Sequence, residues 1–239
     1  MAGSEELLFL SAIKKEAPHC TAFRSAARFA FFDMDHTLTR SDTGFAFLRW
    51  WGRRNPRKCA GVAVRFLLAP FVLALWKLRL IRLHTVKNFF FSVLRGQSAA
   101  QIDASARAFV HSSFDRLIKK EALAYIKVLR KNYNLVLVSA SPEFYVRYFA
   151  ERLGFAYYAG TRYGFHNDVC AGRIEGEDCR GEEKVRRIAE LIDLAAIDHA
   201  GSAAFSDNLR ADAPMLALAG SAFRVHRKKW RLFLVGARV

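Results

Sequence analysis

Three short apolar runs in the chain each end in polar or acidic residues. They are Arg28–Asp33, Leu135–Ser139 and Ser202–Asp207. Uninterrupted apolar runs of this length are typical of strands that are buried on both faces of a parallel sheet. Functional residues of such sheets lie at the carboxyl ends of the strands. We therefore predict three core strands that carry functional side chains at their ends.

Helical segments are expected between and after these strands. Two follow the second and third strands, over Pro142–Arg152 and Ala211–Ala219, and in a third, Glu182–Leu194, apolar residues recur at helical spacing. A Gly- and acid-rich loop is expected between Ile174 and Gly181. Strands that alternate with helices predict an α/β fold with a doubly wound, Rossmann-like parallel sheet as its core.

The stretch from Phe45 to about Arg130 interrupts this alternation. It is rich in Trp and Phe, contains long runs without Gly, and reads as several helices inserted between the first and second core strands. We take residues 44–130 as a helical cap over the site, called the cap segment below. Residues 1–43 and 131–239 would then form the core.

The net charge of +16 is concentrated in two regions. Thr43–Ile102 contains eleven Lys or Arg and no acid, and Ala213–Val239 contains six more, again with no acid. The rest of the chain is close to neutral. The positive charge therefore belongs mainly to the cap segment, where it favours an anionic partner.

The longest uncharged apolar run of the cap segment is Phe66–Trp76, eleven residues that include Pro70. A membrane-spanning helix needs about 20 apolar residues, so a spanning helix is disfavoured. If a helix continued through Pro70, Arg65, Arg79 and Arg82 would lie within about 100° of one another. An apolar helix edged with cations is typical of a membrane interface; the alternative is a buried helix whose cations extend to solvent.

Cysteine usage favours a reducing compartment. The four cysteines are scattered without a C-x-x-C pair, which predicts neither a zinc site nor a disulfide framework: Cys20, Cys59, Cys170 and Cys179. Met1–Leu10 carries two acids before a short apolar run, so it is not expected to be a secretory signal. We expect a cytoplasmic protein, peripheral at the inner face of the membrane.

Asp33 and Asp35 are the first candidates for chemistry. On a strand, this spacing would point both side chains the same way, roughly 6–7 Å apart. One carboxylate can attack phosphorus and form an acyl phosphate, while the other acts as acid and then base. Mg²⁺ would offset their repulsion and neutralise the phosphate oxygens. Taken alone, the pair could equally be two acids in a solvated turn.

Four motifs in order strengthen this interpretation. They are Asp33-Met-Asp-His-Thr37, Ser139 at a strand end, Gly181-Glu-Glu-Lys184 at a helix start, and the segment 206–216, Ser-Asp-Asn-Leu-Arg-Ala-Asp-Ala-Pro-Met-Leu. In this the chain resembles the haloacid dehalogenase superfamily over about residues 28–226. The resemblance is to its phosphoserine-phosphatase-like subgroup, which has a cap between the first and second motifs.

This resemblance implies a role for each motif residue. Asp33 would be the nucleophile and Asp35 the acid and base, and Ser139 and Lys184 would bind the phosphoryl group. Asp33, Asp35 and Asp207 would hold Mg²⁺, with Asp212 supporting them from behind.

Two departures from the family pattern concern single positions. His36 stands where many relatives have glycine, and we interpret it as a turn residue. Asp207 and Asp212 are five positions apart where the subgroup often has four. Which of these two binds the metal directly therefore stays open.

Two features bear on the substrate. Asp42 occupies a position where phosphoserine phosphatases carry an acid that reads the substrate amine, although capping of the first cap helix is the preferred interpretation. The order of the cap segment, an Arg-rich helix, a Pro-interrupted apolar run and a Phe-rich stretch, resembles the bacterial phosphatidylglycerophosphate phosphatases. A basic, aromatic surface attracts anionic lipid at about 1 kcal/mol per cation.

We therefore expect a Mg²⁺-dependent phosphate monoester hydrolase with an aspartyl-phosphate intermediate. Its substrate would be a phospholipid phosphate such as phosphatidylglycerophosphate. The alternative is a soluble phosphatase of a small metabolite such as phosphoserine, with the basic cap steering anions. A third hypothesis is a basic nucleic-acid-binding module, but the sequence has no helix-turn-helix, zinc-finger or RNA-binding signature, so nucleic acid is not an expected partner. The sequence does not indicate the leaving alcohol or the oligomeric state.

Overall fold

The computed structural model of the chain describes residues 27–228 and 230–237. The expectation for Met1–Leu10 and the thiol of Cys20 lie outside these residues. Within them, Cys59, Cys170 and Cys179 are free.

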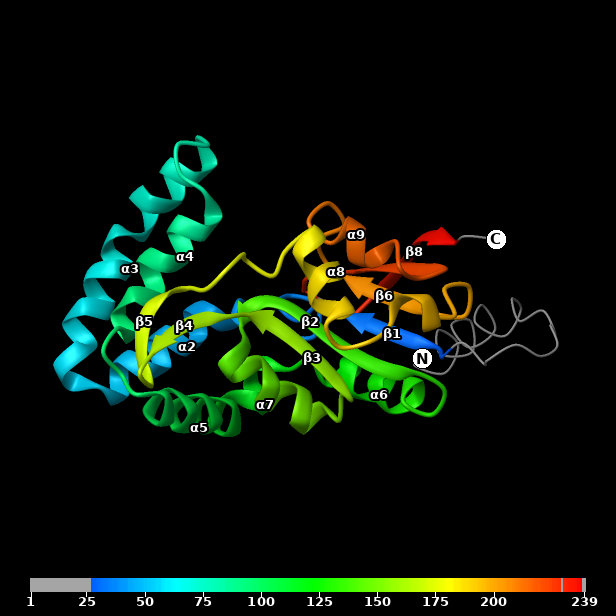
Figure 1. Ribbon diagram of the computed structural model, residues 1–239, viewed down its shortest axis with the longest axis horizontal. Coiled ribbons are helices and arrows are strands. Elements are labelled where there is room, and N and C mark those ends of the chain that lie inside the picture. The colour runs from blue at the N-terminus through cyan, green and yellow to red at the C-terminus, as the bar shows by residue number, and fades with distance from the viewer. Residues whose placement is uncertain (1–26, 229, 238–239) are drawn as a thin grey trace.

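A six-stranded sheet forms the centre of the molecule, with the strand order β3-β2-β1-β6-β7-β8 (Figure 1). The strands are β1 (Phe29–Phe32), β2 (Asn134–Pro142), β3 (Tyr157–Thr161), β6 (Ala203–Ser206), β7 (Ser221–Val225) and β8 (Leu232–Ala237). β1 pairs in parallel with both β2 and β6, and β8 is antiparallel to β7. The three predicted core strands are therefore confirmed, and they are neighbours.

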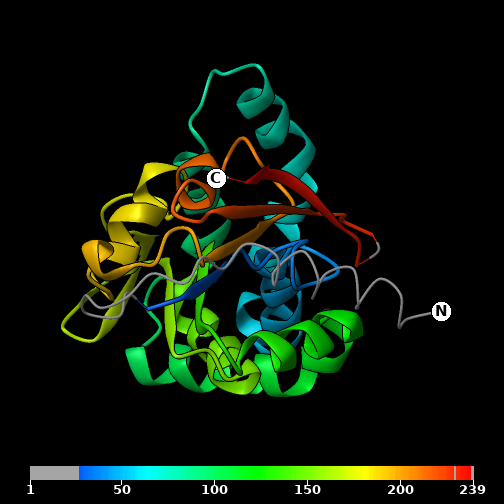
Figure 2. The ribbon, with the colours of Figure 1, turned by 90° about the vertical axis from the view of Figure 1, so that its right-hand side faces the viewer.

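Helices cover both faces of this sheet, which confirms the doubly wound fold (Figures 1 and 2). They are α6 (Lys120–Leu129) and α7 (Glu143–Leu153) on one face, with α8 (Glu182–Ala189) and α9 (Ala213–Leu216) on the other. β1 alternates between the two layers, because Phe29 and Phe31 pack with the α8–α9 side and Phe32 packs with the opposite side. All three rings are buried.

Two of the predicted helices are shorter than expected. α8 stops at Ala189 because the Asp193 side chain accepts a hydrogen bond from the Ala195 amide and starts the 3₁₀ turn η2 (Leu194–Ala196). α9 begins only at Ala213, since the Asn208 side chain bonds the Ala211 amide and holds a turn before it. In both places an Asp or Asn side chain accepts a hydrogen bond from a nearby backbone amide and stabilises a turn in place of the helix, as is typical of these residues.

The cap segment consists mainly of helices. They are α2 (Thr43–Arg54), α3 (Pro56–Lys77), α4 (Leu83–Phe91), η1 (Ser92–Leu94) and α5 (Ala99–Leu117), followed by α6. α3 and α4 form a hairpin that projects from the body of the molecule (Figure 1).

A small antiparallel sheet, β4 (Tyr163–His166) with β5 (Val169–Ile174), was not predicted. It lies against the cap helices, because Cys170 exchanges backbone hydrogen bonds with Gly96 and Gln97.

Helix α3 differs from the sequence prediction in four ways. It continues through the exposed Pro70, where water can satisfy the carbonyl that loses its amide partner. With 22 residues it is long and apolar enough to cross a membrane by length and composition, so the expectation of too short an apolar segment was wrong. It ends at Lys77, and Arg79 follows in a turn with φ of 62°. Arg65 points back to α4, where it donates to the Phe89 carbonyl and to Ser92, so the predicted basic edge of the helix is absent.

The stack of aromatic rings across β1, β6 and β7 generates a stability prediction. The Phe205 ring lies 4.4 Å from that of Phe32 and 5.1 Å from that of Phe223, between centroids, and is fully buried. We expect Phe205→Ala to lower the free energy of unfolding by about 3–5 kcal/mol in urea titration. Phe233→Ala, at a ring that is 50% exposed, is the control and should cost less than about 1 kcal/mol. Equal losses for both would contradict the stacking as a source of stability.

Candidate active site

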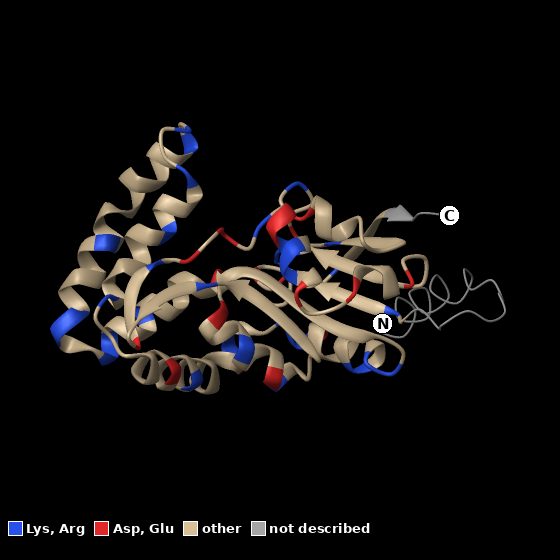
Figure 3. Cartoon of the chain, in the orientation of Figure 1, with Lys and Arg blue, Asp and Glu red and all other residues tan. Residues whose placement is uncertain are grey.

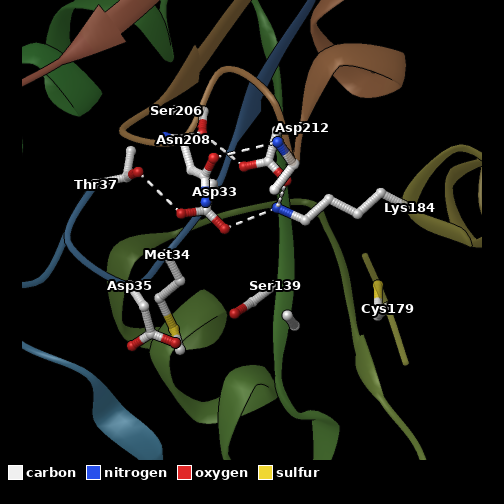
Figure 4. Close-up of polar contacts among 12 residues, drawn as sticks. Asp33, Met34, Asp35, Thr37, Ser139, Cys179, Lys184, Ser206, Asn208 and Asp212 are labelled. Atoms are coloured by element: carbon white, nitrogen blue, oxygen red, sulfur yellow. Dashed lines mark hydrogen bonds and ion pairs between the residues drawn. The ribbon is translucent and has the colours of Figure 1, made fainter. Parts of the chain in front are cut away.

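A buried lysine joins two carboxylates at the carboxyl edge of the sheet (Figure 4). Lys184, only 1% exposed, donates to Asp33 Oδ1 at 2.7 Å and pairs with Asp212 Oδ1 at 2.8 Å. The other oxygen of Asp212 accepts from the Ser206 hydroxyl at 2.6 Å. The start of α8 brings the lysine here after Gly181, whose φ of 61° favours glycine. The cluster thus joins the ends of β1 and β6 to α8 and α9.

The charged groups of this cluster shift one another's pKa values. Burial raises the pKa of Asp33 to about 6, while Lys184 opposes the shift. Burial alone would lower the pKa of Lys184, but the two carboxylates outweigh it and raise that pKa. Lys184 is therefore a cation at neutral pH, and Asp33 is mainly ionised.

Asp35 lies apart from this cluster (Figure 4). β1 ends at Phe32, so Asp33 and Asp35 follow the strand, and the argument that strand alternation points them the same way was wrong. Asp35 accepts hydrogen bonds from the Ser141 hydroxyl at 2.5 Å and from the Thr43 amide at 2.7 Å. Burial, followed by the charge of Asp42, raises the pKa of Asp35 to about 7. At neutral pH it is divided between its acid and base forms.

A chain of hydroxyls holds Asp35 in place. The Thr43 hydroxyl lies 3.1 Å from that of Ser141 and 3.2 Å from that of Tyr145. The network therefore ties the first residue of α2 to the end of β2 and to α7. Ser141 was not predicted from the sequence, although a second hydroxyl two positions after Ser139 at the same strand end was a usable signal.

His36 has a φ of 61°, the left-handed backbone conformation that glycine adopts most easily. This confirms its interpretation as a turn residue. Lys119 also stabilises this turn, because its buried ammonium donates hydrogen bonds to the His36 carbonyl at 2.5 Å and to the His226 carbonyl at 3.2 Å.

Thr37 connects Asp33 to Asp207. Its hydroxyl donates to Asp33 Oδ2 at 2.9 Å, accepts from the Asp207 amide at 2.9 Å, and lies 3.4 Å from Asp207 Oδ1. The second oxygen of Asp207 accepts from Arg227 Nε at 2.8 Å. The carboxylates of Asp33 and Asp207, which directly follow β1 and β6, thus lie on either side of the Thr37 hydroxyl.

The predicted metal ligands line one cavity, but each is engaged with other partners. Asp33, Asp35 and Asp207 all line one cavity, yet Asp35 faces Ser141 and Asp207 faces Arg227. In the described part of the chain, no three His, Cys, Asp or Glu form a ready metal cluster. The donor set fits Mg²⁺ chemically, since it consists of carboxylate oxygens whose mutual repulsion contributes to the raised pKa of Asp33.

Two other predicted residues have structural partners. Ser139 is buried, and its hydroxyl accepts from the Ser141 amide at 3.0 Å, while the cavity is lined by the three residues after it. Asp42 lines the cavity, but one of its oxygens accepts from the Phe45 amide, so the expected cap of α2 is confirmed.

The cavity has a polar end and an apolar end. Its volume is about 350 Å³. The carboxylates and Lys184 line one end, and side chains of α3 and α4 line the other: Leu73, Trp76, Leu83, Val86 and Phe90. Lys87 of α4 reaches across to the core, donating to the Ala140 carbonyl at 2.6 Å and to Asp178 at 2.5 Å. The cavity therefore lies between cap and core.

The mostly parallel sheet, the carboxylate–lysine cluster at its carboxyl edge and the cap segment beside the cavity are together typical of α/β enzymes whose site is covered by an inserted segment. A family model of haloacid dehalogenase-like hydrolases matches residues 30–217, and the chain belongs to this family. The expected superfamily and the expectation of an enzyme are thereby confirmed.

Individual proteins are similar as well. Protein CicA of Caulobacter vibrioides is 35% identical over 204 residues, which cover 83% of this chain and 86% of CicA. A Bordetella pertussis protein with unknown function has a TM-score of 0.65 at 20% identity, covering 76% of this chain and 82% of its own. A phosphoserine phosphatase, solved as a phospho-aspartyl intermediate analogue, has a TM-score of 0.56 at 18% identity, covering 82% and 85%. These two solved structures share the fold of this chain.

The hydrogen bond from Ser141 generates a pH prediction. A donor to a carboxylate stabilises its ionised form and lowers its pKa, so Ser141→Ala should raise the pKa of Asp35. If Asp35 acts as the acid, the alkaline limb of the kcat/KM profile should move to higher pH by roughly half a unit or more. Thr85→Ala, at an exposed hydroxyl of α4 that does not line the cavity, is the control. A limb that stays in place or moves to lower pH would contradict the role of Ser141.

Proposed function

We propose that this hydrolase is a Mg²⁺-dependent phosphatase of phospholipid phosphate monoesters, such as phosphatidylglycerophosphate, that works at the cytoplasmic face of a membrane. The observation that carries the proposal is the cavity, in which the catalytic carboxylates and an apolar wall from α3 and α4 line one continuous space. A substrate that fits it has a phosphate at one end and a hydrocarbon at the other.

Asp33 is the proposed nucleophile. Its carboxylate attacks phosphorus, the bond to the leaving alcohol breaks, and an acyl phosphate forms on Asp33. Lys184, held at 2.7 Å, keeps this carboxylate in place and compensates charge on the phosphoryl group. The pKa of about 6 leaves Asp33 mostly ionised at neutral pH, as a nucleophile must be.

Asp35 is the proposed acid and base. It gives its proton to the leaving oxygen in the first step and takes a proton from water in the second. That water attacks phosphorus, inorganic phosphate leaves, and the Asp33 carboxylate is restored. A pKa of about 7 suits a group that must exist in both forms.

Asp33, Asp35 and Asp207 are the residues that would hold Mg²⁺. When bound, the ion would neutralise phosphate oxygens and the repulsion between the carboxylates. Asp207 is favoured over Asp212 as the direct ligand because its ion-pair partner Arg227 is an exposed side chain, whereas Asp212 is held in a buried ion pair with Lys184.

The apolar wall favours a lipid over a small metabolite. Phosphoserine would fill only the polar end and leave the hydrophobic side chains of α3 and α4 uncovered. Asp42 lines the cavity and offers one carboxylate to an amine, which is the feature that favours the metabolite alternative. Nucleic-acid binding as the main function is not favoured, because the chain belongs to a hydrolase family.

A phosphate-release panel tests the proposal. With Mg²⁺ and mixed micelles, we expect turnover of phosphatidylglycerophosphate well above that of phosphoserine, and loss of activity when the metal is chelated. Asp33→Asn should lower kcat by roughly three orders of magnitude or more, because an amide is no nucleophile. Asp115→Asn, at an exposed carboxylate on α5, is the matched control. Brisk hydrolysis of phosphoserine with no lipid activity would overturn the substrate assignment.

The apolar wall itself can be tested with Leu73→Gln. Leu73 lines the cavity from α3 at a distance from the carboxylates. A polar side chain there should lower kcat/KM for the lipid phosphate about tenfold, while turnover of glycerol 3-phosphate stays within about twofold. Steady-state kinetics with both substrates provide the measurement. Equal loss on both would indicate general damage to the fold.

A further inference from the structure

Helix α3 presents a row of large apolar side chains to solvent. Leu67 is 79% exposed and Phe71 is 64% exposed, with Val64 and Leu68 beside them. Positions 64, 67, 68 and 71 follow the helical period and form one stripe. We call these four residues the outer α3 face. At the tip of the hairpin, the exposed Leu78 and Leu80 extend it.

The opposite side of α3 is fully used within the protein. Phe66 packs on Phe45 and Phe90, with ring centroids 5.9 and 6.3 Å apart. Val62 fits against Gly52, where a Cβ would lie 3.1 Å from it. Farther along, the inner side of the helix provides the apolar wall of the cavity. The outer α3 face is therefore not needed for the fold.

Cations flank this face at both ends. Six cations between Arg53 and Arg82 are exposed, three at the start of α3 and three at its end: Arg53, Arg54, Arg57, Lys77, Arg79 and Arg82. Figure 3 shows basic positions at both ends of the hairpin. Between the two groups, the cation of α3 is Arg65, which is turned inward to α4. No Asp or Glu occurs between Thr43 and Ile102. Such a surface fits an anionic lipid leaflet. The apolar side chains can enter the hydrocarbon region, while the cations lie at the depth of the lipid phosphates.

We propose that the outer α3 face docks in the plane of an anionic membrane leaflet, with the six flanking cations at the level of the lipid phosphates. The lipid nature of the substrate rests on the proposed function, but the docking surface stands on the exposure and charge of α3 alone. Docking in this way brings the apolar end of the cavity next to the leaflet, because both are built by the same hairpin. The enzyme then meets its substrate where the substrate resides.

A second copy of the chain fits this face less well. Pairing two outer α3 faces would bring two acid-free, basic surfaces together with no carboxylate to offset them. Crossing the bilayer is also disfavoured. The helix would have to give up the packing of Phe66, the contact of Val62 with Gly52 and the hydrogen bonds of Arg65 to α4.

Sedimentation of the full chain with vesicles tests the docking. The vesicles are phosphatidylcholine alone or with about one-third phosphatidylglycerol. We expect binding to the anionic vesicles, and a reduction of about tenfold or more in the partition coefficient for the double variant Leu67→Gln with Phe71→Gln. Arg79→Gln should reduce it about fivefold. Leu123→Gln, at an exposed leucine of α6, which covers the sheet far from the α3–α4 hairpin (Figure 1), is the matched control and should bind as the parent does.

Two readouts separate docking from damage and from the substrate assignment. The thermal midpoint of the double variant, and its turnover of para-nitrophenyl phosphate, should equal those of the parent. Vesicle binding without any lipid hydrolysis would refute the proposed substrate and support the surface. Lipid hydrolysis in micelles without vesicle binding would refute the surface and support the substrate.

Three results would overturn the docking proposal. They are equal binding by the double variant and the parent, a stable dimer that the double variant dissolves, or resistance of the bound protein to extraction at high pH, which would indicate a spanning helix.

Discussion

The buried ammonium of Lys184 lies between the carboxylates of Asp33 and Asp212, at 2.7 and 2.8 Å, where water is excluded. A buried ammonium between two carboxylates is stable only when all three charges are present. Removing one partner of a buried ion pair typically lowers the free energy of unfolding by about 3–5 kcal/mol. The set therefore requires that the ends of β1 and β6 and the first turns of α8 and α9 converge on one point. The parallel strand order around β1 supplies this convergence, and the reacting carboxylate is held ready as a consequence.

The cap contributes what the core lacks. Thr43, the first residue of α2, orients Asp35 through its backbone amide, and Lys87 ties α4 to the core beside the cavity. The α3–α4 hairpin has one apolar side turned to the cavity and another turned to solvent. The α3–α4 hairpin thus provides both an apolar wall for the hydrocarbon chain of the proposed substrate and an apolar surface suited to the membrane that contains this lipid.

The strand ends and Lys184 were predictable because buried apolar runs and ordered motifs are local signals. Partners that depend on long-range packing were not, which is why Ser141 as the partner of Asp35 and the β4–β5 sheet came only from the structure. The end of α8 and the start of α9 were predicted wrongly, because the side chains of Asp193 and Asn208 each accept a backbone hydrogen bond that forms a turn there. Asp35 was placed on a strand that in fact ends before it, so its direction is set by the turn at His36.

The nucleophilic role of Asp33 is the central claim, and trapping the covalent intermediate tests it most directly. Acid quenching during turnover of the lipid phosphate, followed by peptide mass spectrometry, should find a base-labile phosphoryl group on the peptide that contains Asp33. The Asp35→Asn variant, given para-nitrophenyl phosphate, whose leaving group needs no proton, should accumulate the acyl phosphate because water is no longer activated. A phosphoryl group on another residue, or hydrolysis that proceeds with no labelled peptide in either protein, would contradict the account.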